Sequence, residues 1–426
     1  MKEAQTICLL NDSFPPQYDG VAAATANYAK ELHSAGHNPL VVTPSNPQAR
    51  DDFPYPVLRY PSVAFRKLEG YMAGIPFSPD TAGRISEQKP ALFHSHCPIM
   101  STIMARELRQ IVDAPIVFTY HTKFDIDIAN LTQSKRVQDM CKKALADNIS
   151  ACDEVWVVSN GAGENLRALG YEGDYIVMSN GVDIPKGRVS EEQIKAATEG
   201  YDLPYDIPIY LFVGRMMWYK GLRIILDALS SLKYRGYDFR MVFIGSGNDK
   251  GEIENYAANI GVADKCIFTG AILDRETLRA WYAKADMFLF PSIFDTNGLV
   301  VREAAASALP SVLIGGSCAA EGIINGYSGF LIDENANSLC TCLQELYGKK
   351  ESIRSVGNNA QRELYISWSE AVAAAMDRYL IVMDKYRCGE YPSRKNPLDS
   401  WLKANGELMD ILSNLPNPRR SLHNGD

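Results

Sequence analysis

The chain has 426 residues, 46% of them hydrophobic, and this length predicts two globular domains rather than one. A formal net charge of −8 argues against non-specific binding to nucleic acid. The nine cysteines include no Cys-x-x-Cys pair, so they predict neither a zinc site nor a disulfide framework, and they favour a reducing cytoplasm. The first apolar run, Ile7 to Leu10, is too short for a signal-peptide core, and we expect no membrane-spanning segment.

Short apolar runs alternate with helical patterns in the first half of the chain. A helix is expected over Ala22–Ala35, because Gly36 provides the signal that ends it. Strands are expected at residues 6–10, 38–43, 56–59, 91–94, 116–119, 155–158 and 175–178. Alternation of this kind predicts a doubly wound parallel sheet.

The second half repeats the alternation. Helices are expected at residues 222–232, 252–260 and 277–283, between strands at residues 209–213, 240–244, 266–268 and 287–290. The intervening segment 185–208 is rich in charge, Gly and Pro and is interpreted as a hinge. The domains are therefore placed at 1–190 and 205–365, followed by a long helix over about 366–390 and a tail over 391–426.

The stretch from Ser292 to Pro310 carries the most functional information. It follows a buried strand, and Gly298 then opens a helix of small residues, so unpaired backbone N–H groups can face an anion. Asp295 precedes this helix and Glu303 lies more than one turn inside it, and both can accept hydrogen bonds from hydroxyl groups. Two carboxylates beside an anion site suit a ligand with a central pyrophosphate, such as a nucleotide sugar.

This stretch resembles the signature of the retaining family 4 glycosyltransferases. In that signature an acidic residue is followed by seven others and then Glu, within a Pro-Ser…Gly-Leu…Glu-Ala…Pro frame. The resemblance implies the α/β GT-B architecture: two Rossmann-like domains face each other across a cleft, and the last helix crosses back to the first domain. It implies an acceptor-binding first domain and a donor-binding second domain. The family usually has Glu where this chain has Asp295, which is one methylene shorter.

A basic motif follows the first strand of the second half. Gly214-Arg215 and, five residues on, Lys220-Gly221 resemble the family's diphosphate-binding motif. A guanidinium can grip phosphate oxygens with two hydrogen bonds, and an ammonium adds a point charge. The alternative interpretation is a pair of solvated basic residues.

Three glycine-containing turns also match family positions. Gly20 and Val21 match the glycine loop that covers the donor phosphates, Gly245 and Gly247 match a turn near the nucleotide, and Ile272 matches the turn that contacts the base. Each match is weak by itself, since ordinary turns have the same composition.

His121, in Tyr120-His121-Thr122, ends a strand of the first half and resembles the family's lipid-acceptor branch, the diacylglycerol glycosyltransferases and phosphatidylinositol mannosyltransferases. The resemblance implies that its imidazole contacts the transferred sugar. His96 is expected to support it, and His94 is expected to be structural.

A basic strip is expected on one face of a helix: Lys135, Arg136, Lys142 and Lys143. The stretch from Phe65 to Met72 also mixes apolar and basic residues. Both suggest peripheral docking on the inner face of an anionic cell membrane, where a lipid acceptor such as diacylglycerol would lie. A solvated helix face is the alternative.

The expected activity is therefore transfer of a hexose from a UDP or GDP sugar, such as UDP-glucose, to an acceptor hydroxyl, as in glycolipid biosynthesis, with no metal and no further cofactor. By resemblance, Arg215 and Lys220 hold the diphosphate. Glu303 holds the ribose, while Asp295 and the amides from Asn297 to Leu299 hold the sugar. Cell-wall, capsule and soluble acceptors stay open. A dehydrogenase is disfavoured, because no Gly-x-Gly-x-x-Gly follows the first strand.

Overall fold

The structure is a computed structural model that describes residues 4–17, 19–64 and 72–391. The chain divides into two compact units. The first unit comprises Met1–Ser179 together with Ala371–Asp426, and the second comprises Asn180–Glu370. The expected tail beyond residue 391, and residues 65–71 of the apolar and basic stretch, lie outside the described residues.

The first unit contains a parallel sheet with seven strands. In spatial order these are β3 (Val57–Tyr60), β2 (Asn38–Pro44), β1 (Thr6–Leu10), β6 (Leu92–Ser95), β7 (Ile116–Tyr120), β8 (Glu154–Val157) and β9 (Ile176–Val177). A small antiparallel pair, β4 (Ser62–Ala64) and β5 (Met72–Gly74), was not predicted. The central strands β1, β6 and β7 are buried at nearly every position because helices cover both faces of the sheet.

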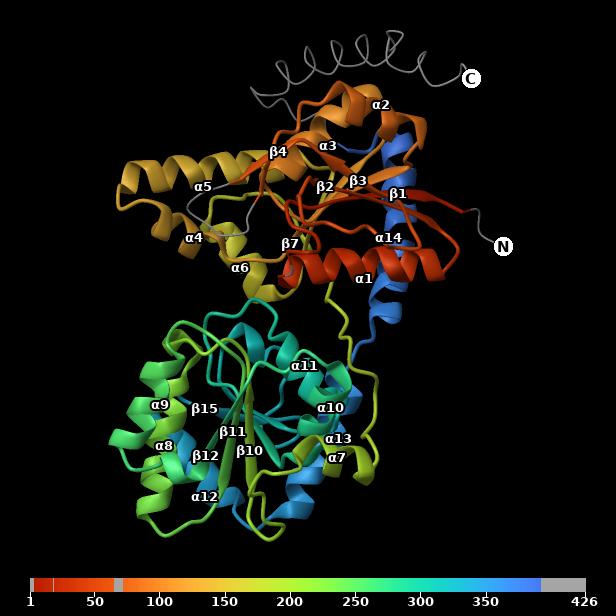
Figure 1. Ribbon diagram of the computed structural model, residues 1–426. Helices are drawn as coiled ribbons and strands as arrows, with labels where there is room; N and C mark the ends of the chain where they lie inside the picture. Colours follow the sequence, from red (N-terminus) through yellow and green to blue (C-terminus); the bar gives the residue numbers. More distant parts are fainter. Residues whose placement is uncertain (1–3, 18, 65–71, 392–426) are drawn as a thin grey trace. The chain divides into compact units, whose positions relative to one another are not determined.

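The helices of the first unit are α1 (Gly20–Ser34), α2 (Pro79–Glu87), α3 (Met100–Ile111), α4 (Phe124–Leu131), α5 (Lys135–Ser150), α6 (Asn160–Ala168) and α14 (Trp368–Arg387). Tyr28 of α1 and Tyr379 of α14 both contact His94, so these two helices share one face of the sheet. On the opposite face, Ser95 hydrogen-bonds to Thr102 of α3, and α3 packs against α2 and α5 (Figure 1).

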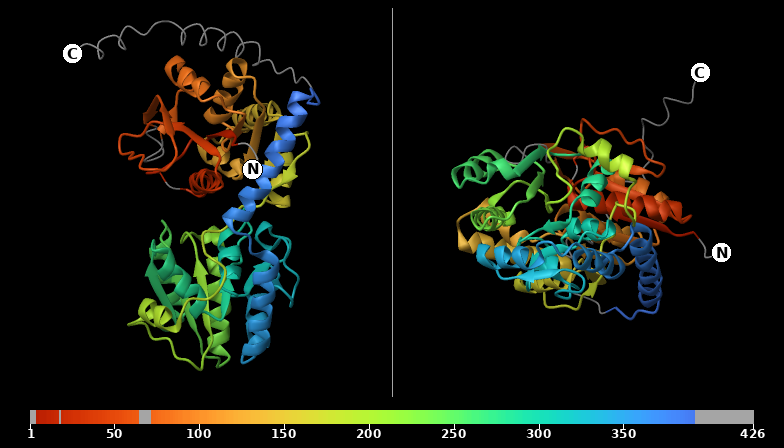
Figure 2. Two further views of the ribbon diagram at one scale, coloured as in Figure 1. Left: turned by 90° about the vertical axis from the view of Figure 1, so that its right-hand side faces the viewer. Right: turned by 90° about the horizontal axis from the view of Figure 1, so that it is seen from below.

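Helix α14 completes the first unit from the far end of the described chain. Tyr379 hydrogen-bonds to His94 across 285 positions of sequence, at 2.5 Å, and its ring stacks on Trp156. Arg378 forms an ion pair with Glu154 of β8. Figure 2 shows α14 running alongside the sheet of this unit. The prediction that the last helix returns to the first domain is confirmed.

The second unit contains a parallel sheet with six strands. In spatial order these are β12 (Cys266–Gly270), β11 (Arg240–Ile244), β10 (Ile209–Val213), β13 (Met287–Leu289), β14 (Ser311–Ile314) and β15 (Phe330–Ile332). The last two strands were not assigned from sequence. The order reverses between β10 and β13, and in such sheets ligands bind beside this switch point, at the carboxyl ends of the strands.

Helices cover both faces of the second sheet (Figure 1). One face carries α8 (Leu222–Tyr234), α9 (Lys250–Asn259) and α12 (Ala336–Leu346). The other carries α7 (Glu191–Thr198), α10 (Arg275–Lys284), α11 (Leu299–Ala306) and α13 (Lys350–Leu364). Three short 3-10 turns are η1 (Trp218–Lys220), η2 (Ala263–Lys265) and η3 (Cys318–Ala320). Helix α7 lies in the segment expected to be a hinge, and it packs against α10.

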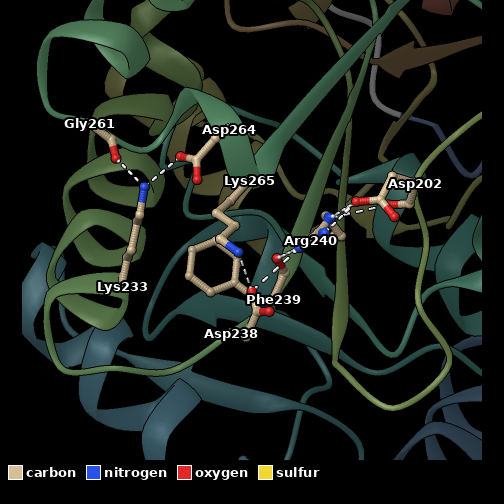
Figure 3. Close-up of polar contacts among 8 residues, drawn as sticks. All are labelled: Asp202, Lys233, Asp238, Phe239, Arg240, Gly261, Asp264 and Lys265. Atoms are coloured by element: carbon tan, nitrogen blue, oxygen red, sulfur yellow. Dashed lines mark hydrogen bonds and ion pairs between the residues drawn. The ribbon is translucent and has the colours of Figure 1, made fainter.

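Ion pairs join the loops at the amino ends of β11 and β12 (Figure 3). Arg240 pairs with Asp202 and Asp238, and Lys265 Nζ lies 2.6 Å from Asp238 Oδ1. Lys233 Nζ contacts Asp264 Oδ1 at 2.6 Å and donates to the carbonyl of Gly261 at 2.8 Å. This edge is opposite to the edge at which the sequence motifs of the second half lie.

Candidate functional site

Two glycine turns meet at the carboxyl edge of the second sheet. The amide of Gly214, after β10, donates to the carbonyl of Ile244, and Met216 donates to Ser246 in the turn after β11. A Cβ at Gly245 would lie 1.9 Å from Gly214 O, and one at Gly247 would lie 2.4 Å from Met216 O. The structure therefore brings the predicted glycines together, and backbone-to-backbone packing of the two turns explains why two of them are glycine.

Lys220 and Asp295 form an ion pair at this edge. Lys220 ends the η1 turn after β10, and its Nζ lies 2.5 Å from Asp295 Oδ1. The Ser292 hydroxyl donates to Asp295 Oδ2, also at 2.5 Å. The Asp295 carboxylate therefore contacts a donor at each oxygen. The sequence assigned Lys220 and Asp295 to different parts of a ligand, whereas in the structure they contact each other.

Arg215 is exposed and makes no ion pair within the part of the chain that the structure describes. It follows Gly214 directly, whereas Lys220 is buried at 8% exposure. The two predicted diphosphate-binding cations thus differ: one is accessible and one is already neutralised by Asp295.

Helix α11 begins at the same edge with unused polar groups. Its N-cap is Gly298, with φ +55°, and no side chain caps the first turn among the described residues. The buried Asn297 accepts from Arg302 through Oδ1 at 3.3 Å, and its Nδ2 lacks a partner in the described structure. The backbone amides near Leu299 and the Asn297 amide therefore offer donors to an anion or a polyol.

Glu303 lies on α11 and receives hydrogen bonds from α10. Arg275 Nη2 contacts Glu303 Oε1 at 2.7 Å, and the Tyr282 hydroxyl donates to Oε2 at 3.0 Å. Ile272, in the turn after β12, is half-buried against the core of this unit. Arg275 and Tyr282 were not predicted from the sequence. Their seven-residue spacing, which places both on one face of α10, is the signal that could have suggested a shared partner.

The start of α1 is capped by the side chain of Asp19. Its carboxylate accepts hydrogen bonds from the amides of Val21 and Ala22, both at 2.8 Å, and the assignment of Gly20 and Val21 to the donor phosphates stays a prediction. A Cβ at Gly20 would meet nothing within 4 Å. In the described residues, the local fold therefore does not require glycine at this position.

Three imidazoles lie in a row at the carboxyl ends of β6 and β7. His96 Nδ1 lies 2.9 Å from His121 Nε2, and the rings of His94 and His96 are 4.0 Å apart. Burial lowers the pKa of His121 to about 3 and also lowers the pKa of His94 and His96. All three are therefore neutral near pH 7. His121 is 8% exposed, with its Nε2 turned toward His96.

The basic strip lies on α5, as expected. Lys135, Arg136 and Lys143 are exposed and Lys142 is half-buried. Val137 and Met140, at 43% and 69% exposure, add apolar surface to the same helix. None of the described helices is long and apolar enough to cross a membrane. The described residues also contain no group of three His, Cys, Asp or Glu side chains that could hold a metal ion.

Two family models match the chain, one in each half. Residues 18–186 match the model described as Glycosyltransferase Family 4, and residues 194–363 match the model described as Glycosyl transferases group 1. The two matched ranges lie on either side of residue 190 and together contain the motifs described above.

Curated relatives and solved structures agree with these matches. A GDP-mannose-dependent alpha-mannosyltransferase of Corynebacterium glutamicum is 25% identical over 77% of this chain and 76% of its own. An alpha-monoglucosyldiacylglycerol synthase of Streptococcus pneumoniae is 22% identical over 72% and 71%. The Anabaena protein HepE, solved with UDP and glucose, shares the fold with a TM-score of 0.68, at 16% identity over 88% of this chain and 99% of its own.

Proposed function

Because the chain is a family 4 glycosyltransferase of the GT-B architecture, we propose that it is a retaining hexosyltransferase that uses a nucleoside-diphosphate sugar. The observation that supports this most is the carboxyl edge of the second sheet. Three cations (Arg215, Lys220 and Arg275), two carboxylates and the uncapped start of α11 gather there. They come from the segments after β10 and β13 and from helices α10 and α11. This set matches the charges and hydroxyl groups of such a donor.

The chemical role of this edge follows from where charge develops during transfer. As the bond to the diphosphate breaks, negative charge builds on the leaving oxygen and positive charge on the sugar. Fixed donors aimed at the leaving group lower the barrier, because they need no reorganisation. We assign this role to Arg215, which is accessible, and to Lys220, which must exchange Asp295 for a phosphate oxygen.

The donor has two further parts that need contacts. Glu303 is assigned to the ribose, and Asp295 with the amides from Asn297 to Leu299 is assigned to the transferred hexose. Release of Asp295 by Lys220 would leave one carboxylate oxygen for a sugar hydroxyl, while Ser292 holds the other. The contact between His121 and the transferred sugar rests on the family resemblance alone and stays a proposal.

For the acceptor, we propose a lipid such as diacylglycerol at an anionic membrane surface. Two observations support it: one similar protein is a monoglucosyldiacylglycerol synthase, and α5 combines exposed cations with the exposed Met140. The mannosyltransferase, by contrast, is named by its donor only. Cell-wall, capsule or soluble acceptors are therefore the alternative outcome of the test.

The test is product analysis. Purified protein is incubated with UDP-glucose, UDP-galactose or GDP-mannose and with lipid extract, diacylglycerol or water-soluble acceptors, and products are identified by mass spectrometry. We expect a hexosyl lipid that retains the anomeric configuration of the donor, as seen by NMR, and its formation should be slower by about two to three decades with Lys220→Ala. A product formed only with soluble acceptors rejects the lipid proposal. An inverted linkage rejects retention, and failure to bind or consume any donor rejects the transferase itself.

A further inference from the structure

Helix α10 supplies both partners of the Glu303 carboxylate. Arg275, the first residue of α10, contacts Oε1 at 2.7 Å, and Tyr282, two turns later, contacts Oε2 at 3.0 Å. Both side chains can only donate here, since a guanidinium has no acceptor and burial, reinforced by the Glu303 carboxylate, raises the pKa of Tyr282 well above its ordinary value. Each oxygen of the Glu303 carboxylate therefore accepts one hydrogen bond from α10.

The burial of this group explains why it needs two partners. The Glu303 side chain is 11% exposed and Tyr282 is fully buried, whereas the Arg275 side chain is 44% exposed. A carboxylate in such a place costs stability unless an opposite charge and hydrogen bonds compensate it. Arg275 supplies the charge and also lies 3.7 Å from Asp183. Tyr282 supplies a neutral hydrogen bond from the core.

The remaining acceptor capacity of Glu303 is limited to a pair of sites. Each carboxylate oxygen can accept about two hydrogen bonds, and each already accepts one. One site is left on each oxygen, and the grip of α10 prevents the carboxylate from turning to present them differently. Two acceptor sites at the spacing of a carboxylate fit two neighbouring hydroxyl groups.

We propose that Arg275 and Tyr282 are positioning residues that make Glu303 selective for the 2′,3′-diol of a ribonucleotide donor over its 2′-deoxy counterpart. The inference rests on the proposed function, which places the ribose at Glu303. The selectivity requires Arg275 and Tyr282 as well as Glu303. Without these two partners the carboxylate can rotate, and it can then bind the single hydroxyl of a 2′-deoxyribose as well as it binds the diol.

Nucleotide binding tests this inference without requiring an acceptor. Calorimetry compares UDP with 2′-deoxy-UDP, and GDP with 2′-deoxy-GDP, for the unmodified protein, Arg275→Ala, Arg275→Lys and Tyr282→Phe. The unmodified protein should prefer the ribonucleotide by about tenfold, as expected for one hydrogen bond to a charged group. Arg275→Ala should reduce this preference to about twofold. Arg275→Lys, which keeps the charge, and Tyr282→Phe, which keeps the ring, should fall between.

A matched control comes from the opposite edge of the same sheet. Arg240 also contacts two carboxylates, so Arg240→Ala removes a comparable ion pair and should leave the ribose preference unchanged. Unchanged preference in both Arg275→Ala and Tyr282→Phe, or no preference in the unmodified protein, overturns the inference alone. Absence of binding by both UDP and GDP overturns the proposed function and this inference with it.

Discussion

Both ends of the strands in the second unit carry ion pairs, but the two sets differ in burial. At the amino edge, the side chains of Asp202 and Asp264 are 75% and 58% exposed. At the carboxyl edge, the side chains of Asp295 and Glu303 are 19% and 11% exposed. Exposed pairs are screened by water and salt, whereas partly buried pairs depend on their partners.

The two edges also differ in what they leave unused. Lys233 and Lys265 at the amino edge already contact carboxylates whose side chains are 58% and 48% exposed. The carboxyl edge retains the exposed Arg215, the start of α11 and the Asn297 amide. Ion pairs by themselves therefore do not indicate where a ligand binds. A better indication is a polar group that still has an unused hydrogen bond next to a partly buried charge.

The largest expected difference between the edges is in catalysis. Lys220→Ala removes a cation assigned to the leaving diphosphate, so it should lower kcat by about two to three decades. Arg215→Ala should act similarly. Steady-state kinetics with a saturating donor measures the effect, and chelator should leave the rate largely intact.

Lys233→Ala is the matched control, because Lys233 also pairs with an aspartate, at 2.6 Å, but at the amino edge. Its kcat should stay within about twofold of the unmodified protein. Comparable losses in Lys220→Ala and Lys233→Ala, or near-normal activity in folded Lys220→Ala and Arg215→Ala, would contradict the assignment of the carboxyl edge.

The half-buried Asp295 and the buried Glu303 should differ from each other in nucleotide binding. Glu303→Gln loses a charged acceptor for ribose and should weaken UDP or GDP binding by about tenfold. Asp295→Asn removes the ion-pair partner of Lys220, so nucleotide affinity should hold or rise slightly while turnover falls. Calorimetry measures the nucleotide affinity of both variants, and steady-state kinetics measures their turnover. Equal losses of nucleotide affinity in the two variants would refute the separate roles of Glu303 and Asp295.

The exposed charges of α5 provide a third environment for comparison. Changing Lys135, Arg136, Lys142 and Lys143 to Gln should weaken binding to phosphatidylglycerol-containing vesicles by at least about tenfold, since each cation contributes roughly 1 kcal/mol near such a surface. Vesicle sedimentation at low and high salt measures this, with UDP binding as the control. If the protein does not bind anionic vesicles at low salt, the basic strip on α5 is only a solvated helix face.

The smallest expected effect is on stability at the amino edge. The hydrogen bond from Lys265 lowers the pKa of Asp238, so its stabilisation is present above the unfolded-state pKa and is lost as the pH falls through the folded-state pKa. Asp238→Asn should lower stability at pH 7 by about 0.5 kcal/mol. Melting curves should show this difference disappearing in acid; a difference that persists there indicates a loss of packing instead.

The sequence predicted the two parallel sheets because buried strands and amphipathic helices leave strong periodic patterns. The return of the last helix to the first domain was implied by the family resemblance instead. The sequence provided no bounds for β14 and β15, although Val312–Ile314 is apolar, because apolar runs of three or four residues do not distinguish a strand from a buried helix segment. It also interpreted residues 185–208 as a hinge, since charge and Gly obscure the short helix α7.

The residues of the candidate site could be predicted from the sequence, but most of the contacts between them could not. Lys220 and Asp295 are 75 positions apart in the sequence and come into contact because β10 and β13 are neighbours in the sheet. The motifs that contain these two residues do not indicate the order of the strands. At Gly20, the family resemblance suggested a phosphate loop, and the structure adds that the adjacent Asp19 caps the helix. Asp is a common N-cap residue, so this cap was predictable from the sequence.

The closure of the first unit by α14 has a consequence for how the protein is made. Tyr379 reaches His94 across 285 positions, so on the ribosome the first sheet is complete long before the helix that covers one of its faces exists. During translation of the second unit, Trp156 and His94 lack their stacking and hydrogen-bonding partner. A nascent chain stalled before residue 371 should therefore recruit chaperones that recognise apolar surface.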